Sequence, residues 1–265
     1  MKTLVIGTSH AANCFTAIKS SIGHTHIDAD MAALGINAWK LILDRCTPVK
    51  TQDGLLLNES DLSLTPTHRK RYDSLNISLG KLRSYDVIIA VDFFFKGWQR
   101  VVDNFAAMND DSSWNLYSAD SSVFPASPAL ISALVEVSGS ISGHGGPYAA
   151  EKMYTQGLTT LPFLKAIESC KRSDAQLLLF PAPMHPSVVT SLESYQSMTT
   201  FRSFICSSNG IDFKPQLPST LSSSMATLPF YSRTDESVIS DPVDMDGHMC
   251  ADYWLMHVDH AGLKA

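Results

Sequence analysis

The chain has 265 residues, of which 45% are hydrophobic and 17% are charged, and its formal net charge is -6. This length and composition are sufficient for one large domain with a substantial core, so we expect a single domain over residues 1–265. The longest basic run is His68–Arg71, and phosphate backbones require a more concentrated basic face. We therefore expect no nucleic-acid partner.

The apolar runs and the cysteines argue against a membrane or extracellular setting. No stretch reaches the roughly 18 apolar residues of a spanning helix, and the N-terminus shows no signal-peptide pattern. The five cysteines are scattered, without a Cys-x-x-Cys pair, which argues against a disulfide framework or a zinc finger. We expect a cytoplasmic protein without a membrane span, whose thiols are buried and reduced.

The N-terminal part of the chain predicts strands and helices in alternation. Thr3–Ile6 is apolar and β-branched and stops at Gly7, which is typical of a buried strand. The other regular elements expected here are a helix over Ala11–Ser20, a strand over Thr25–Asp28 and a helix over Leu75–Leu82. The polar segment between Thr47 and Arg71 predicts an irregular excursion over the surface.

Two continuous apolar runs later in the chain, Tyr85–Val91 and Ala175–Phe180, predict strands that are buried on both faces, as in a parallel sheet. An irregular insertion is expected around residues 93–147. Ala251–Val258 is predicted to form the last helix. The alternation of buried strands and helices predicts an α/β fold, a three-layer α/β/α sandwich around a mostly parallel central sheet.

Short segments at opposite ends of the chain carry the residue types of nucleophilic catalysis. Gly7–His10 follows the first strand as a tight turn that contains Ser9, and Asp244 and Asp246 lie just before His248. A serine nucleophile needs a base that takes its proton, and the base needs an acid that holds its tautomer. The two segments therefore hold candidates for all three roles.

Other interpretations of these segments remain open. Ser9 is also placed to act as the N-cap of the next helix, and Cys250 lies two residues past His248, an awkward spacing for a nucleophile beside its base. The turn lacks the glycine and lysine pattern of nucleotide-binding loops, so phosphate binding is a weaker alternative. Four histidines suggest a metal site: His24, His26, His257 and His260. The last two lie in the C-terminal tail, where chain ends usually fray, and we expect no metal.

The two segments resemble sequence blocks of the SGNH (GDSL-like) hydrolases. Gly7–His10 resembles the first block, in its Gly-x-Ser-His variant, and Asp246–Met249 resembles the last block. The resemblance implies a flavodoxin-like fold, Ser9 as nucleophile, His248 as general base, an acyl-serine intermediate and no cofactor. The family usually places its acid three residues before the histidine, where this chain has Met245. We favour Asp246 as the acid, with Asp244 or a dyad without an acid as alternatives.

The resemblance also implies hydrogen-bond donors for an oxyanion. The family uses the N–H of the serine, a glycine N–H from a second block and an asparagine side chain from a third. Gly35 is the candidate for the second block, although an ordinary turn glycine explains it equally well. Asp92 stands where the asparagine is expected, and an ionised carboxylate cannot donate. His10 is expected to support the turn or line the site, and Gly143–Gly146 offers further backbone donors.

The resemblance implies a serine esterase that acts on a small-molecule or carbohydrate ester, for example by removing an acetyl group. An O-acyltransferase would share the same acyl-serine intermediate, so the sequence does not separate transfer from hydrolysis. A third alternative is a degenerate protein of the same fold that binds a glycan or another ligand without turnover, because the asparagine and the usual acid position are both altered.

Overall fold

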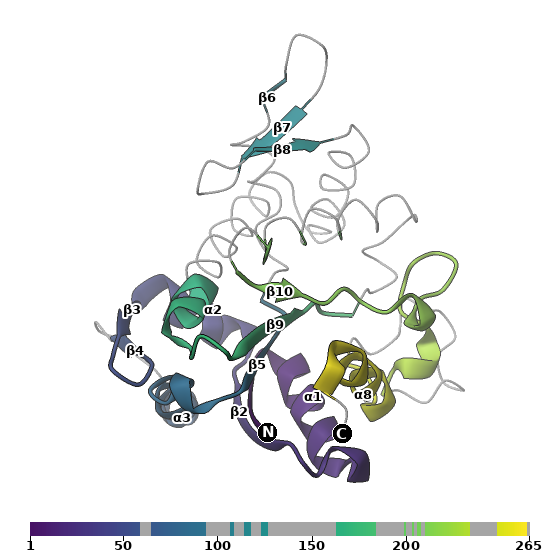
Figure 1. The fold of residues 1–265 in the computed structure, drawn as a ribbon. Helices are drawn as coiled ribbons and strands as arrows, with labels where there is room; N and C mark the ends of the chain where they lie inside the picture. The colour runs from purple at the N-terminus through teal and green to yellow at the C-terminus, as the bar shows by residue number, and fades with distance from the viewer. Residues whose placement is uncertain are drawn as a thin grey trace.

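The structure is a computed structural model that describes residues 1–58, 65–93, 107–108, 114–117, 123–126, 163–183, 199, 203, 206–207, 210–233 and 248–263. In these ranges a central sheet contains five strands, all paired in parallel (Figure 1). They are β1 (Lys2–Gly7), β2 (Asp28–Ala33), β5 (Val87–Val91), β9 (Gln176–Phe180) and β10 (Asp212–Phe213). The predicted α/β fold with a mostly parallel sheet is confirmed.

The strand order is β10-β9-β5-β1-β2, so β1 lies between β2 and β5. From β1 the chain first adds β2 on one side and then adds β5, β9 and β10 on the other side. Counted along the chain, the order is 2-1-3-4-5, the order of flavodoxin-like sheets. Val5 of β1 pairs with Met31 on one side and with Ile89 on the other. In open sheets of this kind, ligands bind beyond the carboxyl ends of the strands, at the point where the order reverses. We therefore expect a ligand site at the carboxyl ends of β1 and β5.

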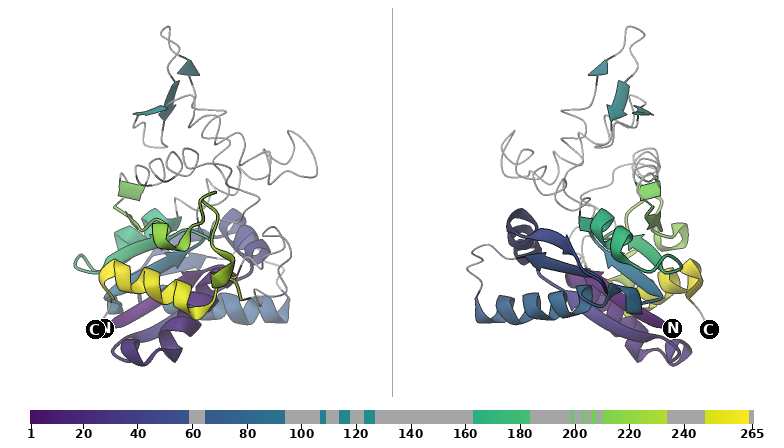
Figure 2. Two further views of the ribbon diagram at one scale, coloured as in Figure 1. Left: turned by 90° about the vertical axis from the view of Figure 1, so that its right-hand side faces the viewer. Right: turned by 60° about the vertical axis from the view of Figure 1, so that its left-hand side comes forward.

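Helices bury both faces of the sheet. On one face Leu4 and Ile88 belong to a core with residues of α2 (Ile36–Arg45) and α3 (Pro66–Leu79). On the other face, Val5 and Ile89 pack with residues of α1 (Ser9–Ser20) and α8 (Ala251–Val258), two helices that lie side by side (Figure 2). Each fully buried aliphatic side chain contributes about 1.5–3 kcal/mol by leaving water. Burial on both faces explains why the strands read as continuous apolar runs.

The expected second strand at Thr25–Asp28 is wrong. Residues Ile22–His24 form a short 3-10 helix, and the strand begins only at Asp28 and continues to Ala33. β2 consists almost entirely of alanine and aspartate, which are depleted in strands, so its local sequence does not favour this structure. Its backbone pairing with β1 decides the conformation instead.

The expectation of an irregular segment from Thr47 to Arg71 is also wrong. An antiparallel hairpin forms from β3 (Thr47–Lys50) and β4 (Leu55–Asn58), and α3 begins at Pro66 rather than at Leu75. In β4, Leu55 and Leu57 are buried while Leu56 is exposed, the alternation of a half-buried strand. Three consecutive leucines show no alternation in the sequence itself, so nothing there predicted a half-buried strand.

The insertion expected around residues 93–147 contains a second small sheet. Its antiparallel strands are β6 (Ala107–Met108), β7 (Trp114–Tyr117) and β8 (Val123–Ala126). The chain after residue 210 contributes β10 at the edge of the central sheet.

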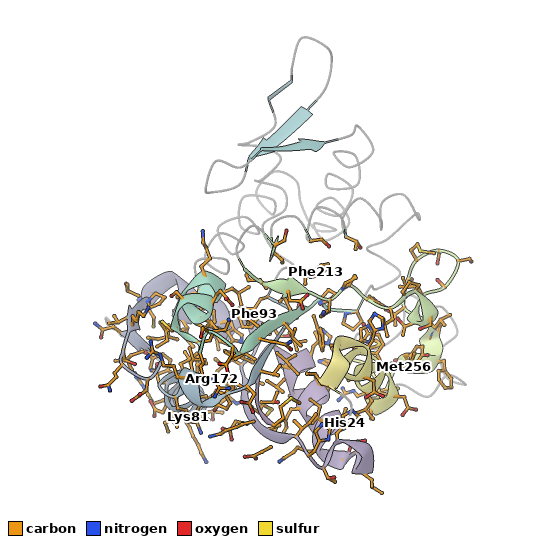
Figure 3. All side chains as sticks on the ribbon, in the orientation of Figure 1. His24, Lys81, Phe93, Arg172, Phe213 and Met256 are labelled. Atoms are coloured by element: carbon orange, nitrogen blue, oxygen red, sulfur yellow. The ribbon has the colours of Figure 1, made fainter. Side chains whose placement is uncertain are left out.

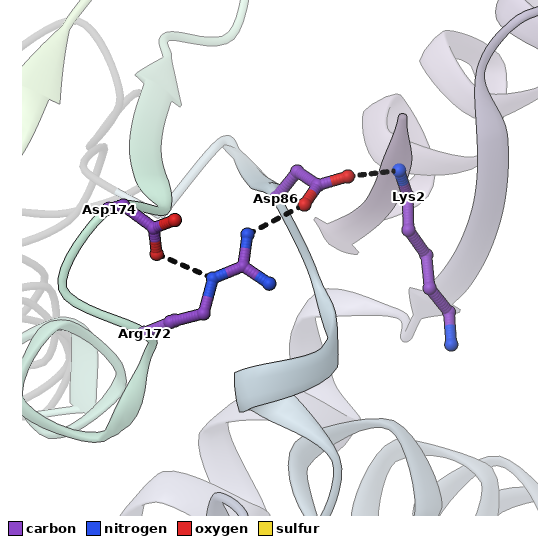
Figure 4. Close-up of polar contacts among 4 residues, drawn as sticks. All are labelled: Lys2, Asp86, Arg172 and Asp174. Atoms are coloured by element: carbon purple, nitrogen blue, oxygen red, sulfur yellow. Dashed lines mark hydrogen bonds and ion pairs between the residues drawn. The ribbon is translucent and has the colours of Figure 1, made fainter.

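Asp86 ties together the amino ends of three strands (Figure 4). One carboxylate oxygen accepts a hydrogen bond from the backbone N–H of Lys2 at 2.7 Å, and the other accepts one from Arg172 at 2.7 Å. Arg172 also binds Asp174, just before β9. The Lys2 N–H, followed by Arg172, lowers the pKa of Asp86 from its usual value. This exposed cluster lies at the end of the sheet opposite to the candidate site and is structural.

His257 holds α8 against the chain segment that follows β10. Its Nδ1 is 2.8 Å from the backbone oxygen of Tyr253, and its Nε2 is 3.1 Å from the backbone nitrogen of Leu217. A backbone N–H can only donate and a carbonyl can only accept, so Nδ1 carries the proton and the ring is neutral. Burial, opposed by the Tyr253 carbonyl, lowers the pKa of His257 from 6.5 to about 4.

We expect the free energy of unfolding to fall as the pH drops from 6.5 towards about 4, because the unfolded chain protonates His257 in this window and the folded chain does not. The contribution of this group reaches about 3 kcal/mol. Urea unfolding across this range should show a weaker pH dependence for His257→Gln than for wild type. The matched control is His260→Gln, which removes an exposed histidine from the next turn. Parallel curves for wild type and His257→Gln would contradict the assignment.

Candidate active site

Ser9 and His248, the two residues proposed as nucleophile and base, meet at the carboxyl end of β1. The Ser9 hydroxyl oxygen lies 2.8 Å from Nε2 of His248, although the residues are 239 positions apart in the chain. Ser9 is exposed and His248 is half-buried. Ser9 lies two residues past the end of β1, the strand at which the order of the sheet reverses. An accessible hydroxyl in contact with an imidazole nitrogen is the arrangement that general-base activation requires.

The N-cap of α1 is Thr8 and not Ser9. The Thr8 hydroxyl accepts a long hydrogen bond of 3.4 Å from the backbone N–H of His10, and Ser9 is the first residue of the helix. The alternative in which Ser9 serves as the N-cap is therefore wrong. The Ser9 hydroxyl contacts Nε2 of His248 instead.

Gly7 makes the sharp turn that presents Ser9. Its φ of +152° lies in a region that side chains disfavour, and a Cβ atom placed there would lie 2.1 Å from the carbonyl oxygen of Val91. The Gly7 carbonyl accepts hydrogen bonds from the backbone N–H of Leu34 at 3.0 Å and from the buried indole of Trp39 at 2.7 Å. Hydrogen bonds from Leu34, the residue after β2, and from Trp39 of α2 therefore fix the turn. The ring of Phe93, which is labelled in Figure 3, packs edge-on against the ring of Trp39.

A short backbone bridge holds His248 in place. Ser232 and Met249 form an isolated antiparallel bridge, in which the N–H of Arg233 donates to the His248 carbonyl at 3.0 Å. On the other side, the N–H of Cys250 donates to the Tyr231 carbonyl at 2.7 Å. Sequence reasoning missed the role of the 231–233 segment, because nothing in its residues marks it as a partner of the histidine.

The ring of His10 lies beside the ring of His248, with centroids 5.0 Å apart. The ring of Trp254, a fully buried residue of α8, lies 6.3 Å from the ring of His10. His10 therefore contacts both the candidate base and a residue of the core. This position agrees with a residue that supports the site rather than one that takes the serine proton.

The carboxylate of Asp92 faces Thr8. The Thr8 hydroxyl donates to it at 2.7 Å, and the backbone N–H of Asp92 donates to the Phe180 carbonyl at 3.0 Å. Asp92 has a φ of +61°, in the left-handed region. The position at which the family resemblance implies an oxyanion donor thus holds an acceptor, bound to the residue next to Ser9.

Gly35 lies at the N-terminus of α2, just after β2, where it is exposed. Its φ of -64° is ordinary, and no atom lies within 4 Å of a Cβ placed on it. Asp244, Asp246 and the Gly143–Gly146 loop lie outside the described residues. Cys250, the alternative nucleophile, is half-buried at the N-cap of α8, while Nε2 of His248 faces Ser9. The geometry favours Ser9 as the partner of the imidazole.

Two of the histidines considered for metal binding, His24 and His257, use both ring nitrogens on other groups. His24, labelled in Figure 3, contacts Ser21 through Nδ1 at 2.9 Å and Asp259 through Nε2 at 2.7 Å. His257 uses both nitrogens on backbone groups. Within the described ranges, no three His, Cys, Asp or Glu side chains come together as a metal site. The helices in these ranges include none that is long and apolar enough to cross a membrane.

No family model, no curated protein and no solved structure matches the chain. The functional assignment therefore depends on the site itself, on its contacts, its place in the sheet and the chemistry of its residues.

Proposed function

We propose that the protein is a serine hydrolase of the SGNH type that cleaves an ester through an acyl-serine intermediate. The observation that carries the proposal is the 2.8 Å contact between the Ser9 hydroxyl and Nε2 of His248. Its place at the carboxyl ends of β1 and β5, where sheets of this order bind ligands, supports the same conclusion. The fold proposed with it is the three-layer sandwich of that family.

In the proposed reaction His248 takes the hydroxyl proton as Ser9 attacks the ester carbonyl carbon. The tetrahedral intermediate then collapses, the bond to the leaving alcohol breaks, and the imidazolium gives its proton to that alcohol. Water, deprotonated by His248, then attacks the acyl carbon, the bond to the Ser9 oxygen breaks, and the imidazolium returns its proton to Ser9 as the acid is released. The first-turn N–H groups of a helix have no intrahelical acceptor, so the start of α1 offers a favourable environment for the oxyanion.

The proposed substrate is a small ester, such as an acetyl group on a carbohydrate, by analogy with the family. Asp246 is the proposed acid that orients His248, with Asp244 as the alternative. Gly35 remains a proposed backbone donor. An O-acyltransferase would form the same acyl-serine and differ only in replacing water by a second hydroxyl.

One observation favours a second candidate function, a protein of this fold that binds a glycan or another small ligand without turnover. Asp92 accepts a hydrogen bond at the place where a donor would stabilise the oxyanion. Loss of one such donor costs about 10²- to 10³-fold in rate. Ligand affinity without a burst of product from an activated ester would favour this candidate.

We expect a fluorophosphonate to form one covalent adduct with the wild-type protein and none with Ser9→Ala, because only a deprotonated hydroxyl attacks phosphorus at a useful rate. Intact-mass spectrometry after incubation measures this directly. Ser20→Ala removes a serine from the other end of the same helix, where its hydroxyl donates to the Ala17 carbonyl, and it should label like wild type. An unlabelled wild-type protein, or equal labelling of Ser9→Ala, would refute the proposal.

A further inference from the structure

Asp92 is held in an unusual backbone conformation beside the candidate site. Its φ of +61° is uncommon for residues other than glycine, asparagine and aspartate. Such conformations persist where the surroundings determine them and often mark functional positions. The surroundings include the Phe180 carbonyl at the end of β9, which accepts from the Asp92 N–H, and the hydroxyl of Thr8.

Thr8 connects Asp92 to the start of α1. Thr8 is 6% exposed, and its hydroxyl has a single hydrogen. Because that hydrogen is donated to Asp92 at 2.7 Å, the oxygen presents its lone pairs to the helix, where it accepts from the His10 N–H. In the sequence, Ser9 lies between Thr8 and His10. The hydrogen bonds that link Asp92, Thr8 and His10 therefore hold the backbone of Ser9 from both sides.

We infer that Asp92 is a positioning residue for the nucleophile. Its carboxylate sets the direction of the Thr8 hydroxyl, which holds the first turn of α1 and keeps the Ser9 hydroxyl within reach of His248. This role differs from the oxyanion donor that the family resemblance implies at this position. The inference rests on the proposed function for its catalytic consequence, while the chain of hydrogen bonds can be tested without turnover.

Asp92→Gly and Asp92→Asn test the role of the carboxylate apart from that of the backbone conformation. Both glycine and asparagine tolerate the positive φ of this position, so neither substitution should strain the backbone. Asp92→Gly removes the acceptor and should lower the second-order rate constant of fluorophosphonate labelling by about 10- to 100-fold, the effect of a misplaced reacting group. Asp92→Asn keeps an acceptor oxygen for Thr8 and should retain most of the wild-type rate. Met225→Gly is the matched control, since Met225 has a φ of +62° in a turn closed by Ser222.

Thr8→Val tests whether Asp92 acts through Thr8. Valine has nearly the same shape but no hydroxyl, so this variant should lose about as much labelling rate as Asp92→Gly. The double variant should be no slower than Thr8→Val alone, because both changes break one chain. In both single variants, hydrogen exchange of the His10 amide should accelerate while the amides of α8 keep their protection.

Slower labelling and faster His10 exchange in Asp92→Gly, with recovery in Asp92→Asn, would support the inference. Unchanged labelling in Asp92→Gly, or losses that add up in the double variant, would overturn it. An unlabelled wild-type protein would refute the proposed function and the catalytic consequence of Asp92. In that case unchanged His10 exchange in Asp92→Gly would also refute the chain of hydrogen bonds, whereas faster exchange would establish it.

Discussion

Replacing His248 with alanine is expected to lower the rate of ester hydrolysis by about 10⁴- to 10⁶-fold, as loss of the base does in serine hydrolases. The reason is the 2.8 Å contact between its Nε2 and the Ser9 hydroxyl, the only route for the serine proton that the described residues show. The measurement is the turnover of p-nitrophenyl acetate. The double variant with Ser9→Ala should be no slower than either single variant, because the two residues act as one unit.

His10→Gln is the matched comparison for this experiment, since it changes a histidine that packs on His248 at a ring distance of 5.0 Å. We expect a loss far smaller than that of His248→Ala, because Nε2 of His248 already faces the serine. An equal loss in both variants would identify His10 as the base and contradict the assignment.

Gly7→Ala is expected to lower the free energy of unfolding by more than about 4 kcal/mol, or to prevent folding. The new methyl carbon would lie 2.1 Å from the Val91 carbonyl oxygen and 3.2 Å from Cβ of Ala11, at a φ of +152° that alanine disfavours. Relief of the clash would require β1 and β5 to separate, although they pair at this position. Urea unfolding followed by circular dichroism measures the change.

Gly35→Ala provides the control, because Gly35 also lies in the turn between a strand of the sheet and the following helix, two residues after β2 and at the N-cap of α2. With a φ of -64° and open space around its Cβ, it should change stability by no more than about 0.5 kcal/mol. This variant keeps the backbone N–H, so a loss of turnover without a loss of stability would indicate that the methyl group obstructs the substrate. Equal stability of Gly7→Ala and Gly35→Ala would contradict the geometry of the Gly7 turn.

The sequence was sufficient to predict the elements with long, continuous patterns. The strands at β1, β5 and β9 are buried on both faces, so their apolar runs are visible without any knowledge of the partners. The last helix has the predicted bounds, Ala251–Val258. Ser9 and His248 were identified by their residue types and their places after the first strand and before the last helix, and the structure brings them into contact.

The tertiary structure decided what depends on partners remote in the chain. β2 is a strand because β1 pairs with it, against the preference of its alanines and aspartates. Thr8 rather than Ser9 caps α1, and its hydroxyl is oriented by Asp92, which lies 84 residues away. The bridge between Ser232 and Met249 holds His248 through backbone atoms. A sequence displays which side chains it carries, whereas backbone pairing and the direction of a hydroxyl are set only when remote segments meet.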